Sequence, residues 1–448
     1  GIDQELDLWN GQIRSQFQFD GQSVSVVTAC DSLHDEIGAQ VVSPLAASGR
    51  VGVKLHFPYP TGKHADDACD WTQPDKHSTT IVAQDAHSAT LKRQLDETTY
   101  YVRLAWEGDA KLSEKEKHYF VLTPQSGDTL SFTCLFTSAE PTGENLSFDT
   151  LLASASRYWN NYWSHGGIVD FSHCKDPRAK ELERRVVLSQ YLMAIQCAGS
   201  VPPQESGLTY NTWFGKFHLE MHWWHGAHFA LWGRPELLER SLAWYRDSAY
   251  DNARAIAERQ GFKGIRWMKM TDPSAIEAPS KVGSFLIWQQ PHFIYMAELI
   301  YRANPSQEVI DRYKDLVAET AEFMYSFATY DELEGRFVLK GAIPAQETLR
   351  AAETVNPPFE LSYWHFALSV AQQWRERQGL QRNPQWDELL DKLSPLAHQD
   401  GLYLAAETAT DTYKDIRFTS DHMAVLGALG ILPKCPLVRE DIMQNTLD

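Results

Sequence analysis

NTWFGKFHLEMHWWHGAHFALWGRPELLERSL (residues 211–242) is the most informative stretch of this chain. It contains four histidines and four tryptophans around Glu220, and it continues into a helical pattern. Polar groups at this density are costly to bury unless each one finds a partner. Flat apolar faces beside fixed donors and acceptors are also what a sugar pocket needs. The stretch therefore predicts a helix that contributes to a binding site.

Around this stretch, from about residue 145 onward, apolar residues recur at three- and four-residue spacing, which predicts amphipathic helices. The clearest are 179–198, 234–260, 289–303, 306–328 and 359–378. Helix starts are predicted at Asp176-Pro177, Asn304-Pro305, Asn356-Pro357 and Asn383-Pro384, and C-terminal caps at Gly261 and Gly379. The pattern gives about ten helices. A toroid of helix hairpins fits this count, and an open α-solenoid is the alternative.

Before residue 145 the chain has the pattern of an antiparallel β-sandwich. Short β-branched or aromatic segments alternate with polar turns at 23–30, 50–57, 78–84, 100–106, 117–123 and 130–136. Residues 57–77 form a long polar excursion between two of these strands, and loops of that length are often functional.

The expected fold class is mainly α, with an (α/α)6-toroid-like helical domain and an N-terminal antiparallel β-sandwich domain. The expected domains are a sandwich over residues 1–144, a linker with a helix over 145–175, and a toroid-like catalytic domain over 176–448. A length of 448 residues is too large for one ordinary core, which supports at least two domains.

Composition argues against some classes of binding partner for this chain. A formal net charge of -18 argues against nucleic acid, because phosphate binding needs a basic surface. No apolar run is long enough to span a membrane. The opening residues GIDQELDLWN are not a signal peptide, so we expect a periplasmic or extracellular protein if such a peptide was removed, and a cytoplasmic one otherwise. The six cysteines do not have the spacing of a zinc site. The one disulfide that the sequence suggests as an option joins Cys30 and Cys134.

The central histidines offer two interpretations. His218, His222 and His225 fall at i, i+4 and i+7, a spacing that would place them on one helix face and suit a metal. The HExxH motif is absent, so we expect histidines that are hydrogen-bonded among aromatic rings, and we predict no metal and no cofactor. Glu220 is predicted to point away from the histidines, and either to line a polar cavity or to pair with Lys216 or Arg234.

Three further segments carry polar groups at predicted loop ends. GIRWMKM (264–270) and the segment after it contribute Arg266, Trp267, Gln289 and His292, with a solvated loop as the alternative. In the loop 341–357, Glu347 is a better candidate acid than Glu353 or Glu360, because a loop can place it at a cavity mouth and Glu360 suits a helix start. Asp421 is either a second carboxylate of the site or a simple helix cap.

On these residues the chain resembles the six-hairpin glycosidase superfamily over about residues 145–433. KFHLEMHWWH (216–225) is similar to the NINLQMNYWP segment of glycoside hydrolase family 95 and to the GHxxWDTE segment of family 65. IPAQETLRAAETVNPPFE (343–360) is similar to the loop of both families that carries the general acid, and SDHMAVLGALGILP (420–433) to a late family 95 segment.

The resemblance implies a glycoside hydrolase in which Glu347 is the acid and Asp421, or second Glu220, is the base. The two water-positioning asparagines of family 95 are replaced by Lys216 and His218, which argues against fucose. The phosphate loop of family 65 is not recognisable, so hydrolysis is expected rather than phosphorolysis. An (α/α)6 toroid has twelve helices, and about ten are expected here, so we expect either a fragment or an incomplete toroid.

We therefore predict an inverting glycoside hydrolase whose substrate is a carbohydrate. The predicted sugar contacts are Trp213, Trp223, Trp224 and Trp267 as stacking faces, and Lys216, His218, His222, Arg266, Gln289 and His292 as polar contacts. Two alternatives stay open: a non-catalytic carbohydrate-binding protein on the same fold, and a metal-dependent enzyme built on the three histidines.

Overall fold

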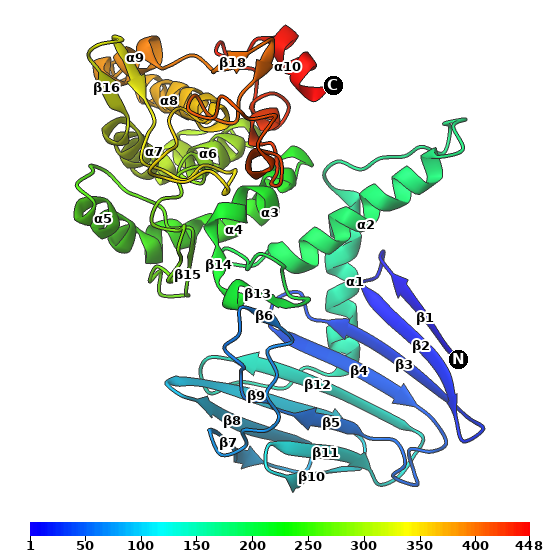
Figure 1. Cartoon of the computed structure of the whole chain (residues 1–448). Coiled ribbons are helices and arrows are strands. Elements are labelled where there is room, and N and C mark those ends of the chain that lie inside the picture. The colour runs from blue at the N-terminus through cyan, green and yellow to red at the C-terminus, as the bar shows by residue number, and fades with distance from the viewer. The chain divides into compact units, whose positions relative to one another are not determined.

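The computed structural model describes residues 1–448, and the chain forms two compact units, Gly1–Ile168 and Val169–Asp448. The first unit is almost wholly β-structure (Figure 1). The expected class, mainly α, therefore describes the second unit rather than the whole chain. Helix α1 (Phe148–Ser164), expected in a linker, belongs to the first unit.

The first unit contains a large and a small antiparallel sheet. The large sheet has the strand order β1-β2-β3-β4-β12-β9-β8-β7, and the small sheet has the order β10-β11-β5. The strands are β1 (Ile2–Asp7), β2 (Gln12–Phe19), β3 (Gln22–Cys30), β4 (Glu36–Val42), β5 (Val53–His56), β6 (Ala65–Asp66), β7 (His77–Gln84), β8 (Ser88–Leu95), β9 (Thr98–Glu107), β10 (Ala110–Glu116), β11 (Tyr119–Pro124) and β12 (Thr129–Thr137).

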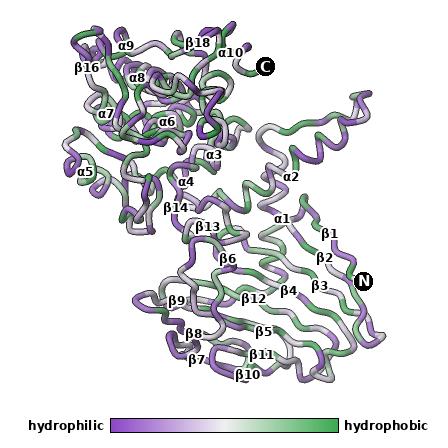
Figure 2. Tube along the Cα trace, in the orientation of Figure 1, coloured by the Kyte–Doolittle hydropathy of each residue, from purple (hydrophilic) through white to green (hydrophobic).

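One core joins the two sheets, as a sandwich requires. Leu91 and Leu104 of the large sheet pack in one cluster with Phe120 and Leu122 of the small one. The alternation of hydrophilic and hydrophobic residues along these strands is visible in Figure 2. All six strands expected from the sequence are present. Strands such as β10 were missed, because an edge strand that reads KLSEKE shows little apolar signal.

All six cysteines are free thiols in the structure. The disulfide considered between Cys30 and Cys134 is therefore not formed. Burial raises the pKa of the Cys134 thiol to about 12, so this side chain behaves as a small apolar core residue.

The second unit is helical. Its helices are α2 (Ala179–Cys197), α3 (Leu219–Leu231), α4 (Pro235–Trp244), α5 (Tyr250–Arg259), α6 (His292–Ala303), α7 (Gln307–Phe327), α8 (Pro358–Arg377), α9 (Pro384–Lys392) and α10 (Glu440–Leu447). A π-helical turn, η2 (Tyr245–Ala249), joins α4 to α5, and 3-10 turns occur at η1 (Trp213–Gly215), η3 (Ile416–Phe418) and η4 (Ala424–Ala428). The short strands are β13 (Asn211–Thr212), β14 (Phe217–His218), β15 (Met270–Thr271), β16 (Thr329–Asp331), β17 (Arg336–Val338), β18 (His398–Gln399) and β19 (Leu402–Tyr403).

The predicted helix caps are confirmed only in part. Asn383 caps α9, since its side chain accepts a hydrogen bond from the backbone N–H of Gln385. Gly261 and Gly379 follow α5 and α8 with positive φ, as expected. The other three Asx–Pro pairs do not cap: α2 begins after Arg178, Ser306 caps α7, and Asn356 instead accepts from the N–H of Leu339.

Helices α6 and α8 form the centre of the second unit. Every residue of α6 from His292 to Ile300 is buried, and α6 packs against α3, α4, α7 and α8. None of the helices combines the length and the apolarity needed to cross a bilayer.

Candidate functional site

The start of α3 lies beside the GIRWMKM segment because a short β-ladder joins them. His218 in β14 pairs with Met270 in β15, and the N–H of Glu220 donates to the carbonyl of Lys269 at 3.1 Å. His218 itself has φ -113° and ψ 88°, outside the helix. The ladder therefore brings two segments that are fifty residues apart into direct contact at one end of α3.

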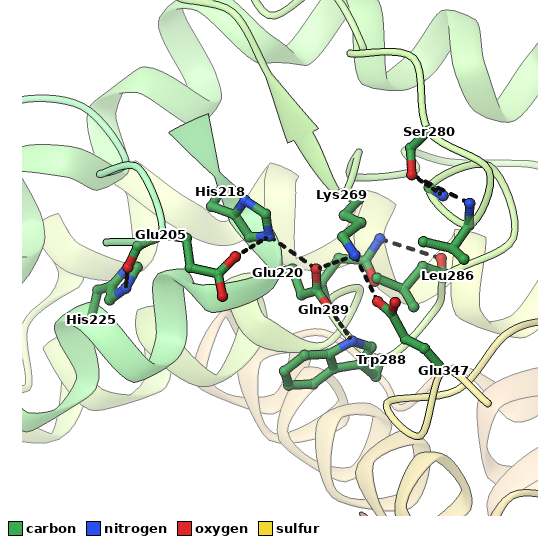
Figure 3. A network of polar contacts seen from close by, with 12 residues as sticks. Glu205, His218, Glu220, His225, Lys269, Ser280, Leu286, Trp288, Gln289 and Glu347 are labelled. Atoms are coloured by element: carbon green, nitrogen blue, oxygen red, sulfur yellow. Dashed lines mark hydrogen bonds and ion pairs between the residues drawn. The ribbon is translucent and has the colours of Figure 1, made fainter. Parts of the chain in front are cut away.

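A chain of charged contacts crosses this junction (Figure 3). Nε2 of His218 lies 3.1 Å from Oε2 of Glu220, and Nζ of Lys269 lies 3.0 Å from the same oxygen. Nζ of Lys269 also lies 2.6 Å from Oε1 of Glu347. The indole N–H of Trp288 donates to Oε1 of Glu220 at 3.1 Å. Lys269 is thus shared between two carboxylates from different segments.

A third carboxylate adjoins this network. Oε2 of Glu205 lies 3.3 Å from Nε2 of His218. Burial raises the pKa of Glu205, and the charges of Glu220 and Glu347 act in the same direction. Glu205 was not expected in the site from the sequence.

The two carboxylates that contact Lys269 have pKa values shifted in opposite directions. Burial disfavours ionisation of Glu220, but its contacts with His218 and Lys269 outweigh burial and hold its pKa at about 2. Burial raises the pKa of Glu347, and the neighbouring charge of Glu220 raises it further, against the opposing effect of Lys269. Two neighbouring carboxyl groups separated in this way are characteristic of acid–base sites.

These groups face a cavity of about 710 Å³. Its polar wall is formed by carboxylates and bases, and the rest is aromatic or aliphatic. The residues that line it are Glu205, Trp213, Glu220, Met221, Trp224, Lys269, Trp288, Ala345, Glu347, Phe359, Asp421, His422, Met423, Ala424, Leu426, Gly427 and Ile431. A volume of this size and a mainly apolar lining with a few convergent polar groups are typical of small-molecule sites.

The loop that carries Glu347 is held on both sides of this residue. The N–H of Ala345 donates to Oε1 of Glu360 at 2.6 Å, and the side-chain amide of Gln346 donates to the carbonyl of Phe418 at 2.7 Å. The N–H of Thr348 donates to Oδ2 of Asp421 at 3.3 Å. Asp421 is therefore not a helix cap: its carboxylate binds this loop and the ring of its neighbour His422, at 2.7 Å.

Glu360 is fully buried at the first turn of α8, and burial raises its pKa to about 7. Between pH 4.5 and 7 the folded protein holds a proton here that the unfolded chain releases, so this group lowers stability as pH rises through that window. Replacing Glu360 by glutamine is expected to remove this loss. The variant should gain stability over the wild type as pH rises: the difference between their free energies of unfolding should grow by on the order of 3 kcal/mol from pH 4 to pH 8. Urea denaturation of both proteins at pH 4 and pH 8 measures this difference. The same change with pH in both proteins would contradict the prediction.

Of the residues predicted for the site, five line the cavity: the carboxylates Glu220, Glu347 and Asp421, and the rings of Trp213 and Trp224. His218 lies directly behind Glu220. Glu220 lines the cavity, which was one of its two predicted alternatives, and its partners are Lys269 and His218 rather than Lys216 or Arg234. Glu220 also does not point away from the histidines, because it contacts one of them.

The other predicted residues do not line the cavity. His222, Arg266, Trp267, Gln289 and His292 are buried, and each makes hydrogen bonds within the protein. His292, for example, lies 2.8 Å from both the hydroxyl of Tyr363 and the carbonyl of Glu220. Trp223 packs its ring against Trp224 and Tyr295, and the side chain of Lys216 is half-buried outside the cavity.

The three histidines do not converge on one point. His218 contacts Glu220, His222 bonds Ser241 and Tyr245, and His225 bonds the carbonyl of Glu205. No group of three His, Cys, Asp or Glu side chains is arranged to hold a metal ion. The helical spacing was misleading because His218 precedes the helix.

Sequence reasoning missed Lys269, Glu205, Trp288 and His422. A signal for Lys269 was present: a lysine between Met268 and Met270, two positions after a tryptophan, is a charge among apolar residues. Such a charge needs a buried partner.

Comparisons with known proteins agree with this architecture. No protein-family model and no curated protein sequence matches the chain. Among solved structures, one described as a kojibiose phosphorylase from the human microbiome superposes with a TM-score of 0.65 at 11% identity, covering 92% of this chain and 59% of its own. A bacterial glucoamylase complexed with acarbose superposes with a TM-score of 0.50 at 11% identity, covering 90% of this chain and 61% of its own. The chain thus spans about three fifths of the length of these structures, and it has a six-hairpin glycosidase-like fold.

Proposed function

We propose that this protein is a carbohydrate-active enzyme, specifically an inverting glycoside hydrolase. The observation that carries the proposal is the pair Glu220 and Glu347, which share one cavity and one lysine but have pKa values shifted in opposite directions. A carboxyl group that keeps its proton can donate it to a leaving oxygen, while an ionised neighbour stabilises positive charge on the sugar.

In this proposal Glu347 is the general acid. It lies on a loop at the cavity wall, and its side chain keeps 34% exposure, so a substrate oxygen can reach it. Burial favours its protonated form. As the glycosidic oxygen takes the proton of Glu347, its bond to the anomeric carbon breaks and the alcohol departs. The oxygen of a water molecule bonds to the anomeric carbon from the opposite face and gives its proton to the base.

Asp421 is the better candidate for the base. Oxygens of Glu220 and Glu347 share Nζ of Lys269 at 3.0 and 2.6 Å, so they lie at most about 5.6 Å apart, the sum of these contacts. An inverting pair needs roughly 6.5–9.5 Å to admit water. Glu220 also accepts from His218, Lys269 and Trp288, which leaves it poorly placed to take a proton from water. Asp421 lines the same cavity without a lysine on it.

The aromatic lining supports a sugar as the ligand. Trp213, Trp224 and Trp288 border the carboxylates, where a ring face could stack while hydroxyls meet charged groups. We restrict the proposed sugar contacts to residues that line the cavity. His222, Arg266, Trp267, Gln289 and His292 then support this wall from behind.

The fold supports the same class. The solved structures with this architecture include a bacterial glucoamylase with bound acarbose, and one described as a kojibiose phosphorylase. We infer that the helices of the second unit form an (α/α)6-type toroid in which some hairpins are short or absent. Hydrolysis is proposed over phosphorolysis because no phosphate-binding loop is recognisable in the sequence.

The test is a panel of 4-nitrophenyl monosaccharides and of disaccharides, incubated with and without phosphate. Hydrolysis without phosphate supports the proposal, and proton NMR of the first-formed anomer decides between inversion and retention. Activity only with phosphate would make the protein a phosphorylase. Binding by calorimetry without release of any product would favour a carbohydrate-binding protein.

Trp224 provides a test of sugar stacking. Its side chain lines the cavity and is 37% exposed. Replacing Trp224 by alanine is expected to raise KM roughly 2- to 10-fold with a smaller change in kcat, on the scale of a lost ring contact. The control is Trp9→Ala, an exposed tryptophan of the first unit, which should leave KM unchanged. Equal effects in the two variants would contradict a stacking role.

A further inference from the structure

Glu360 is a buried carboxyl group that the proposed reaction does not use. It has no exposed surface, one oxygen accepts the N–H of Ala345, and the other oxygen has no hydrogen-bond partner. No lysine, arginine or histidine lies within ion-pair distance of it. A fully buried carboxyl group without a cation is costly.

No charged group on the elements packed against α8 forms an ion pair with Glu360. On α6, Glu298 binds Arg302 and Arg377, and His292 bonds Tyr363. On α7, Glu319 bonds Tyr250, and Glu322 bonds Trp386. On α9, Asp387 pairs with Arg382, while η4 carries no charged residue. The charge of Glu360 is therefore set by burial and by the backbone N–H groups at Ala345 and at its own position.

The contact between Glu360 and Ala345 lies next to the proposed acid in the chain. Ala345 lines the cavity and stands two residues before Glu347 on the same loop. On the other side of Glu347, Asp421 accepts the N–H of Thr348. Carboxylates therefore hold the backbone just before and just after the proposed acid.

We propose that Glu360 is a positioning residue, whose ionised carboxylate anchors the loop at Ala345 and so fixes Glu347 against Lys269 in the cavity. A hydrogen bond from an N–H to a carboxylate is about twice as strong as one to a neutral acceptor, so uptake of a proton by Glu360 loosens the anchor. The catalytic part of this inference rests on the proposed function, but the anchor itself does not.

The anchor titrates in the neutral range. The pKa of Glu360 is raised to about 7, so roughly 3% of the groups are ionised at pH 5.5. The ionised, anchored form therefore dominates above pH 7 and is lost as pH falls. This change opposes that of Glu347, which must keep its proton to act and loses it as pH rises. The two titrations together predict a bell-shaped dependence of kcat on pH.

Glu360→Gln separates charge from shape, because the amide oxygen can still accept from Ala345 but the group no longer titrates. We expect wild-type kcat to fall about 10-fold or more from pH 7.5 to pH 5.5, and this acidic limb to flatten in the variant with KM little changed. Glu360→Leu removes the acceptor and should lower kcat at every pH. Glu353→Gln is the matched control: an exposed glutamate of the same loop, paired with Arg417, whose loss should leave the profile as in the wild type.

Hydrogen exchange of the peptide that spans residues 341–349 tests the anchor without any substrate. After correction for intrinsic exchange, its protection should fall at least about fivefold from pH 8 to pH 6 in the wild type, but not in Glu360→Gln. Protection that is independent of pH in the wild type, or the same change in both proteins, overturns the inference. If the exchange result holds but no glycoside is cleaved, the proposed function fails and the anchor stands. If glycosides are cleaved but Glu360→Gln keeps the wild-type acidic limb, the inference fails alone.

Discussion

Replacing Glu347 by glutamine is expected to lower kcat by roughly 10²- to 10⁴-fold for glycosides whose leaving group is an ordinary sugar or alkyl alcohol. Such alcohols leave poorly without a proton, and glutamine has none to give. A 2,4-dinitrophenyl glycoside of the same sugar leaves as a stable phenolate and needs little protonation. The loss with that substrate should therefore be much smaller. Steady-state kinetics with both substrates measures the difference.

Protein stability offers a check on this result. Glu347 is about one third exposed, and Lys269 keeps Glu220 as a partner after the change, so the variant should fold normally. Glu353→Gln, on the same loop, should keep wild-type kinetics with both substrates. In the wild type, activity should also decline as pH rises past the raised pKa of Glu347, and that basic limb should vanish in Glu347→Gln. Equal losses with both leaving groups would assign Glu347 a role other than acid.

Replacing Lys269 by methionine is expected to have the largest effect on stability, a loss of about 3–5 kcal/mol in the free energy of unfolding. Lys269 and Glu220 are both more than nine-tenths buried, and the ammonium group is shared between two carboxylates. Removing it leaves Glu220 ionised in a buried site with only His218 and Trp288 as donors. Breaking one partner of a buried pair costs more than the pair itself contributes, because the other charge is left uncompensated.

A double variant shows whether this interpretation is correct. Lys269→Met combined with Glu220→Gln removes both charges, and it should recover part of the stability lost in Lys269→Met alone. Lys314→Met is the matched control, since Lys314 forms an exposed pair with Asp311 on α7 and its loss should leave stability near the wild type. Chemical denaturation at pH 7 measures all three. A double variant no more stable than the single one would mean that Lys269 acts through packing rather than charge.

The amino-acid sequence by itself determined the local structure of this protein. Hydrophobic periodicity gave six strands of the sandwich and the main helices, because a period of two or of 3.6 residues is written directly in the order of the residues. It also singled out Glu347 and Asp421 as loop carboxylates and Trp213 and Trp224 as rings near one cavity. It misjudged His218, because spacing along a helix predicts a shared face only where the helix has already begun.

Tertiary structure alone decided which of these groups meet. The ladder between β14 and β15 brings Lys269 to Glu220, and the loop of Glu347 completes the triad from a third segment. These contacts span 49 and 78 positions of the chain, and no local pattern encodes a partner at such distances. The proton affinities follow from the same contacts, since burial and neighbouring charges, rather than residue type, separate Glu220 from Glu347.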